Sequence, residues 1–272
     1  MSFSKGLLFK EVPFAIGADM DNTEKFSGKA DVYERFRPSY PQALYDFISR
    51  RFLPERDGTV IDTGSGTGKF ALPLAPLCGR LICVEPNADM RRKLCANAAG
   101  RDNVEVISSA AENIPLPPAS AELITAAQAF HWFDRAAFGR ECARLLRNGG
   151  HVALIWNIRK SCDIRDELYS VNKKYCPLFG GFSGGYSDKD IRSFDDFFAK
   201  GTSDVASFSN DTVFFGEEEF VGRCLSSSYA PAPGSDGYTA YVAALAELYG
   251  RYARGGRLTV PMDAVMFFGK VY

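Results

Sequence analysis

The residues best suited to chemistry lie in a glycine-rich turn, VIDTGSGTGKF, at residues 60–70. The turn follows an apolar segment, precedes a potential helix, and contains three glycines and an acid, Asp62. Because glycine has no Cβ, such a turn lets a ligand approach the backbone closely. Turns of this kind hold nucleotide phosphates, dinucleotides or S-adenosylmethionine (AdoMet), so the glycine spacing and the nearby side chains must distinguish these ligands.

The spacing of the glycines argues against a phosphate ligand. A P-loop has the pattern GxxxxGK[ST]. Aligned on Gly68 and Lys69, that pattern needs a glycine and a hydroxyl side chain where this chain has Thr63 and Phe70. A dinucleotide fingerprint has the pattern GxGxxG, whereas residues 64–68 read GxGxG. The third glycine comes one position too early for a pyrophosphate turn.

An AdoMet site fits the turn better. The backbone would approach the ligand along Gly64, Ser65, Gly66, Thr67 and Gly68. At the end of the preceding strand, Asp62 would accept a hydrogen bond from the ammonium group of the ligand, directly or through water. The next apolar segment, RLICVE, ends on Glu85, where a carboxylate accepts both ribose hydroxyls. NAD enzymes use the same acid, so Glu85 alone does not separate the two cofactors.

Six stretches in order give the chain its resemblance to a known family. They resemble the class I AdoMet-dependent methyltransferases, specifically the small-molecule group that includes the trans-aconitate methyltransferase-like proteins. The stretches are ERFRPSYP (34–41), VIDTGSGTGKF (60–70), VEPNADM (84–90), AAENIPL (110–116), AQAFHWFD (127–134) and ARLLRNGGHVALIWN (143–157). Residues 211–272 match more loosely. The resemblance implies AdoMet as methyl donor, S-adenosylhomocysteine (AdoHcy) as product, no metal, and a small-molecule acceptor.

The resemblance also assigns the remaining cofactor contacts. It places Tyr33 and Arg37 in an N-terminal lid, with Arg37 pairing with the methionine carboxylate or with an anionic substrate. Around the adenosine it implies Pro86, Met90, Ala111 and Glu112, with the Met90 thioether covering an adenine face. It places Gln128 beside the methionine part of the ligand. The sequence departs from the family at Ala110, where an aspartate often accepts from the adenine amino group. Adenine recognition would then depend on backbone near Ala111 and on Glu112, which could equally stay in solvent.

The acceptor side is assigned to residues that follow the later strands. We expect Tyr40, Trp132, Asn157 and Arg159 to contact the substrate, with Arg159 suited to a substrate acid. His131 is the candidate general base or orienter of the acceptor, because imidazole titrates near neutral pH. The alternative is that His131 hydrogen-bonds locally and fixes its loop.

These side chains need a sheet whose strands end at one edge. Short apolar segments at 58–62, 80–85, 104–107, 123–126 and 151–156 alternate with helical patterns, which is typical of a parallel sheet covered on both faces. Pro73 and Pro76 predict a short or kinked helix after the glycines. Asp134 should cap a helix that runs to Leu146 and ends at 148–150.

The second half of the chain predicts helical insertions and closing strands. Helical periodicity covers 162–178, 190–200, 217–227 and 238–254, and extended segments cover 211–215 and 258–272. We therefore expect an α/β fold: a Rossmann-like, doubly wound, mostly parallel seven-stranded sheet with an antiparallel C-terminal strand, an N-terminal helical lid and helical insertions after strand 5. All 272 residues would form one domain, with a lid and helix (20–55), a cofactor core (56–157), a substrate-side insertion (158–210) and C-terminal helices and strands (211–272).

Composition narrows the partners. The net charge of −1 gives no field that would attract nucleic acid or an anionic membrane. No stretch approaches the roughly 18 apolar residues of a membrane span, and the N-terminus lacks the features of a signal peptide. Seven cysteines without CxxC spacing fit reduced thiols, and two histidines make a His-based metal site improbable. We therefore expect a cytoplasmic protein, and the sequence leaves open whether it forms a homo-oligomer.

Three rival functions follow from the same turn. A methyltransferase acting on nucleic-acid amines commonly has an Asn/Asp-Pro-Pro-aromatic loop after strand 4, where this chain has AQAFHWFD (127–134) and no basic tail. An NAD-dependent oxidoreductase would need the dinucleotide spacing. A non-catalytic AdoMet-binding protein would bind the cofactor and never consume it.

Overall fold

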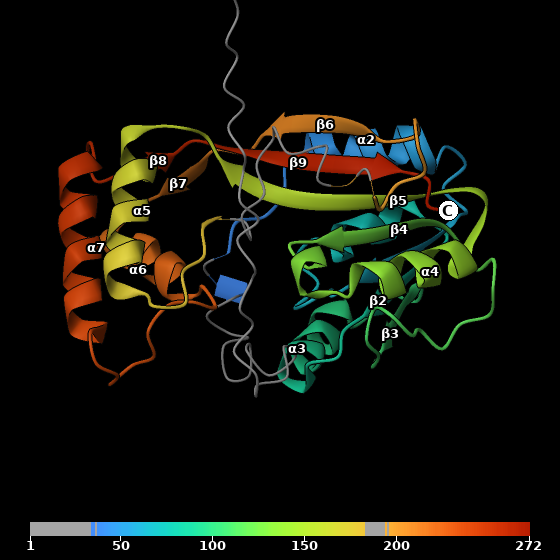
Figure 1. The fold of residues 1–272 in the computed structure, drawn as a ribbon, viewed down its shortest axis with the longest axis horizontal. Helices are drawn as coiled ribbons and strands as arrows, with labels where there is room; N and C mark the ends of the chain where they lie inside the picture. The colour runs from blue at the N-terminus through green and yellow to red at the C-terminus, as the bar shows by residue number, and fades with distance from the viewer. Residues whose placement is uncertain (1–33, 36, 183–193, 195) are drawn as a thin grey trace, which may run out of the picture.

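A seven-stranded sheet forms the centre of the computed structural model, which describes residues 34–35, 37–182, 194 and 196–272 (Figure 1). The strand order is β3-β2-β1-β4-β5-β9-β6. The strands are β1 (Thr59–Thr63), β2 (Arg80–Val84), β3 (Val104–Ile107), β4 (Ala121–Ala127), β5 (Leu146–Arg159), β6 (Asp204–Ser209) and β9 (Met262–Gly269). β1 to β5 pair in parallel, and β9 is antiparallel to both neighbours. The fold class predicted from the sequence is confirmed.

Each face of the sheet is covered by helices because the strands are apolar on both sides. All five residues of β1 are buried. On one face, Val60 and Leu81 pack with α2 (Gln42–Phe52), η2 (Leu72–Leu77) and α3 (Ala88–Ala98). On the other, Ile61 and Ile82 pack with α4 (Arg135–Leu145) and with Phe194. This two-sided burial is what a parallel sheet requires.

Local signals in the sequence explain where the helices begin. The side chain of Asn87 accepts from the backbone N–H of Met90 at 3.0 Å and caps α3. Asp134 accepts from the N–H of Ala137 at 2.9 Å and caps α4, as predicted. Pro73 and Pro76 restrict the segment after the glycines to the short 3₁₀ helix η2, which confirms the expected interruption.

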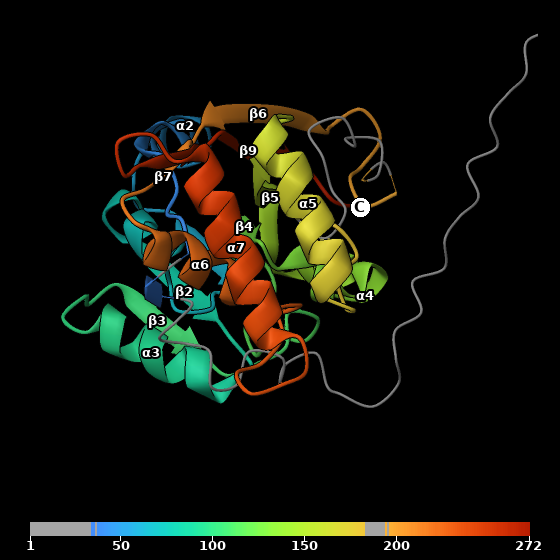
Figure 2. The same cartoon turned by 90° about the vertical axis from the view of Figure 1, so that its left-hand side faces the viewer.

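A second group of helices lies at one end of the molecule, beside the sheet (Figures 1 and 2). It contains α5 (Asp163–Tyr175), α6 (Glu217–Leu225), α7 (Tyr238–Tyr252) and the two-stranded sheet of β7 (Thr212–Phe214) and β8 (Leu258–Val260). These elements share their own buried apolar cluster, in which Tyr241 and Leu245 are fully buried. Among the described residues, no helix is long and apolar enough to cross a membrane.

Three expectations about boundaries were wrong. β5 begins at Leu146, five residues earlier than predicted, so residues 148–150 lie inside the strand instead of ending the helix. The described residues of the predicted helix 190–200, Phe194 and 196–200, form turns and no α-helix. The strand β6 was not predicted, because its burial alternates along only six residues at the edge of the sheet and its apolar content is low.

Candidate functional site

Two adjoining cavities open at the carboxyl ends of β1, β2 and β4. The first has a volume of about 140 Å³ and is lined by Glu85, Pro86, Met90, Ala111, Glu112 and Gln128, among others. The second has a volume of about 30 Å³ and includes Arg37, Tyr40, Asp62, Ser65, Gln128 and Asn157 in its lining. Gly64, Ala127 and Gln128 line both cavities. Ligands of open α/β sheets bind at this edge, and most residues singled out from the sequence meet there.

Glu85 connects the glycine turn to the end of β2. Its Oε2 accepts from the N–H of Gly66 at 2.7 Å, and its Oε1 accepts from the N–H of Asn87 at 2.8 Å. The carboxyl group is buried, with 6% of the residue exposed, and burial raises its pKa above the usual value. Each carboxylate oxygen can accept a second hydrogen bond. Glu85 therefore can hold a diol in the first cavity while it holds the turn in place.

The glycine turn needs glycine for two physical reasons. Gly64 has φ +65°, and a Cβ there would meet the Cβ of Ala129 at 2.6 Å. Gly68 has φ +86°, and a Cβ there would meet the side chain of Leu94 at 2.6 Å. Both the left-handed backbone and the close packing exclude larger side chains. The turn thus presents bare backbone to the point where the two cavities join.

Asp62 is the buried acid of the second cavity. Its Oδ1 accepts from the Thr125 hydroxyl at 2.6 Å, and its backbone carbonyl accepts from the Ser65 hydroxyl at 2.9 Å. Burial raises the pKa of Asp62 to about 7, and these hydroxyl contacts act against the shift. A cationic group placed beside Asp62 would compensate the buried charge. This environment suits the ammonium group of an amino acid.

Gln128 carries backbone strain at the junction of the cavities. It has φ +56°, which is uncommon for a residue other than glycine. Its N–H donates to the carbonyl of Ile155 at 2.8 Å, which fixes the turn that follows β4 to the neighbouring strand. Strained residues of this kind cluster at ligand sites, where the surrounding structure maintains them.

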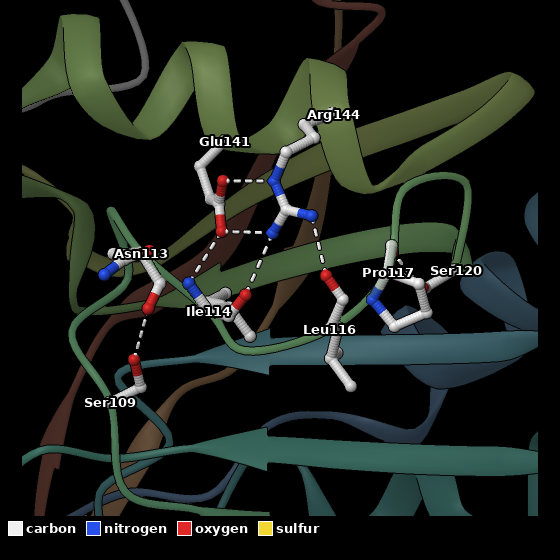
Figure 3. A network of polar contacts seen from close by, with 8 residues as sticks. All are labelled: Ser109, Asn113, Ile114, Leu116, Pro117, Ser120, Glu141 and Arg144. Carbon is white, nitrogen blue, oxygen red and sulfur yellow. Dashed lines mark hydrogen bonds and ion pairs between the residues drawn. The ribbon is translucent and has the colours of Figure 1, made fainter.

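The loop that carries Ala111 and Glu112 is held from behind by α4 (Figure 3). Arg144 donates from Nη1 to the carbonyl of Leu116 at 2.6 Å and from Nη2 to the carbonyl of Ile114 at 2.9 Å. Glu141 accepts from Arg144 Nε at 2.8 Å and from the N–H of Ile114 at 2.6 Å. The pair satisfies three backbone groups of the loop and so fixes one wall of the first cavity.

Asn157 holds the N-terminal segment against the sheet. Its Oδ1 accepts from Asn210 Nδ2 at 2.8 Å, and Asn210 Nδ2 also donates to the carbonyl of Ser39 at 2.9 Å. Tyr40 packs edge-on against Phe70, with 5.0 Å between ring centroids. Both predicted substrate residues therefore line the second cavity and also anchor the segment that covers it.

Four predicted site residues line neither cavity: Thr67, Gly68, His131 and Arg159. Tyr33 falls outside the described residues. Thr67 donates its hydroxyl to Glu34 and lines neither cavity. Trp132, assigned from the sequence to the acceptor side, lines the first cavity. His131 lies beside Trp132 on the 3₁₀ helix Phe130–Trp132, with the two rings tilted at 46°, and it lines neither cavity. Arg159 also lines neither, and its guanidinium covers the Phe182 ring at 4.4 Å.

Gly68 likewise supports the turn from outside both cavities, whereas Gly66 lines the first. Two charged lining residues were missed by sequence reasoning. Lys69 and Arg223 both line the second cavity. Arg223 lies between Phe220 and Cys224 on the buried face of α6, so a charge on an apolar helix face was the signal that could have revealed it. Within the described residues, no group of three His, Cys, Asp or Glu side chains converges to hold a metal ion.

Comparisons with known proteins agree with this geometry. Residues 61–154 match the family model described as a methyltransferase domain. A Dictyostelium discoideum protein named as a methyltransferase is 40% identical over 134 residues, which are 49% of each chain. A Mycobacterium bovis protein named as an uncharacterized methyltransferase is 37% identical over 139 residues, 51% of this chain and 54% of its own.

A solved structure extends the similarity to the whole fold. It is described as a type II methyltransferase from Anaeromyxobacter dehalogenans, with a TM-score of 0.64, 23% identity, and coverage of 86% of this chain and 98% of its own. Residues 61–154 therefore resemble a methyltransferase domain, and they lie within a fold that the solved methyltransferase shares. The chain spans about half the length of the curated relatives it matches.

Proposed function

We propose that this chain is an AdoMet-dependent methyltransferase that acts on a small molecule. The observation that carries the proposal is the pair of adjoining cavities with one buried acid in each: Glu85 faces the first and Asp62 the second. In AdoMet, the ribose diol lies on one side of the sulfonium and the ammonium group of the methionine part lies on the other. The two acids match these groups in type and order, with bare glycine backbone between them.

The residues of the first cavity would hold the adenosine of the cofactor. Glu85 accepts the ribose hydroxyls, and the buried thioether of Met90, 3% exposed, packs against the base. The carboxylate of Glu112 lines the cavity, although its Oε1 already accepts from the N–H of Asp134 at 2.9 Å. Its second oxygen remains available to an adenine amino group.

The residues around the junction would align the reaction. AdoMet supplies an electrophilic methyl group on its sulfonium, so the chain needs only to orient the acceptor in line and exclude water. Gly64 and Gln128 line both cavities and therefore border the place where the acceptor meets the methyl group. An ionised carboxylate acceptor needs no base. His131 lines neither cavity, which favours its role in fixing the loop over proton removal.

The proposal is tested by product formation. The protein is incubated with AdoMet carrying an isotopically labelled methyl group and with a metabolite extract, and products are found by mass spectrometry. We expect the labelled methyl group to appear on a small molecule, with unlabelled AdoHcy as the second product, and we expect this transfer to be absent in the heat-denatured control. Tight binding of AdoHcy without turnover on any extract would favour the non-catalytic alternative. Tight binding of NADH in place of AdoHcy would contradict the cofactor assignment.

A further inference from the structure

Arg223 is a buried cation that no described acid neutralises. It lies on α6, is 6% exposed, and lines the second cavity. Buried arginines are almost always paired with an acid. Among the residues that the structure describes, Arg223 forms no ion pair, and its buried Nη1 has no hydrogen-bond partner. An unsatisfied buried guanidinium costs stability, so its retention indicates a ligand.

The charged neighbours of Arg223 are mostly cations as well. Burial and the charges of Arg37 and Arg159 lower the pKa of Arg223 to about 9, so it remains cationic at neutral pH. Lys69 lines the same cavity, and burial, with smaller contributions from Arg223 and Arg37, lowers its pKa too. The one acid that lines the cavity is Asp62, whose pKa burial raises to about 7. The second cavity therefore has an excess of positive charge.

Arg159 extends this charge beyond the cavity. It ends β5, and its buried Nε has no hydrogen-bond partner among the described residues. The face of Phe182 covers one side of its guanidinium at 4.4 Å, which leaves the planar edge for a ligand. A guanidinium presents paired N–H donors that match a carboxylate or phosphate.

We propose that Arg223 and Arg159 form an anion subsite for the methyl acceptor, so that the acceptor is a small organic anion bearing a carboxylate or phosphate group. The inference rests on the proposed methyltransferase function. The cofactor has one carboxylate, and Arg37 is better placed to take it, because Lys69 Nζ, beside the glycine turn, donates to the carbonyl of Arg37 at 2.8 Å. Arg223 and Arg159 come from α6 and the end of β5, on the side away from the adenosine cavity.

The subsite is tested first by binding, without turnover. Protein saturated with AdoHcy is titrated calorimetrically with succinate and with inorganic phosphate, and with neutral succinamide as a control. We expect millimolar or tighter binding of at least one anion and none of succinamide. Arg223→Gln and Arg159→Gln should each weaken anion binding at least about tenfold, which corresponds to the loss of one hydrogen bond from a charged group. Arg140→Gln, an exposed residue of α4 without a described ion pair, should leave it unchanged.

Two ligand sources are separated with the same variants. AdoHcy contains a carboxylate and 5′-methylthioadenosine does not. Under the proposal, Arg223→Gln binds both nucleosides as the wild type does. If Arg223→Gln weakens the binding of AdoHcy about tenfold and leaves the binding of methylthioadenosine unchanged, the guanidinium holds the carboxylate of the cofactor and the acceptor subsite is refuted. Failure of the wild type to bind AdoHcy would instead refute the proposed function, while anion binding would still report on the subsite.

A turnover arm tests the substrate class. A metabolite extract is separated by anion exchange into anionic and non-anionic pools, and each is offered with methyl-labelled AdoMet. We expect label transfer to the anionic pool, lost in Arg223→Gln. Transfer confined to the non-anionic pool, or the absence of any anion binding by the wild type, would overturn the proposal. Because Arg223 is buried, Arg223→Met is included: relief of an unpaired charge should leave the melting temperature unchanged or raised, whereas a structural arginine would lower it.

Discussion

Replacing Glu85 tests how the cofactor is held. In Glu85→Gln the side chain keeps its shape and loses its charge, and one terminal atom changes from acceptor to donor. Hydrogen bonds to a charged group contribute about 1.5–3 kcal/mol. If the Glu85 carboxylate accepts the ribose hydroxyls, AdoHcy affinity should fall by about 10- to 150-fold. AdoHcy affinity should fall at least as far in Glu85→Ala, because this change also removes the acceptors of the Gly66 and Asn87 N–H groups.

A double-mutant cycle separates ribose binding from damage to the turn. Calorimetric dissociation constants are measured for AdoHcy and for its 2′-deoxy analogue, with the wild type and with Glu85→Gln. If Glu85 binds the ribose, removal of the 2′-hydroxyl from the ligand weakens its binding to the wild type and has little effect on its binding to Glu85→Gln. Glu105→Gln, an exposed acid of β3, serves as the control. Equal dissociation constants for wild type and Glu85→Gln, or additive effects in the cycle, would refute the ribose assignment.

The remaining predictions concern residues around the two cavities. Burial raises the pKa of Asp62 to about 7, so between roughly pH 4 and 7 the folded state holds a proton that the unfolded state has released, and stability falls as pH rises through this window. In urea unfolding at pH 8, the free energy of unfolding of Asp62→Asn should therefore exceed that of the wild type by about 2–4 kcal/mol, and at pH 4 the difference should be much smaller. An equal difference at both pH values would contradict the assignment. Arg144→Met removes the contacts that hold the 114–116 loop, so AdoHcy affinity should fall about threefold or more in titration calorimetry, while Arg140→Met on the same helix should match the wild type. His131→Gln should retain AdoHcy affinity and turnover within about threefold, and a loss of about 100-fold in turnover alone would identify a general base.

The sequence predicts well which residues of the glycine turn and the first two strand ends come together, because the signals there are local. Asp62, the glycine turn and Glu85 each sit at the end of an apolar strand, and parallel strands bring their carboxyl ends to one edge. The strand pattern therefore fixes both which residues meet and where. Met90 follows for the same reason, since Asn87 caps α3 immediately after β2.

The lining of the second cavity was less predictable because it is assembled from distant segments. Arg223 reaches the second cavity only when α6 packs beside the end of the sheet, and nothing local in residues 217–225 indicates that packing. Trp132 lines the first cavity, and its predicted contact with the substrate stays a prediction. The Glu141–Arg144 pair was missed because its partners are backbone carbonyls, which carry no sequence signal.

A crystal structure of the protein with AdoHcy tests the central claim most directly. The account predicts AdoHcy across both cavities, with its ribose hydroxyls at hydrogen-bonding distance, about 2.6–3.0 Å, from the Glu85 carboxylate, and with its amino group on the Asp62 side of Gly64. An empty crevice at saturating AdoHcy, or a ligand whose ribose lies away from Glu85, would contradict it.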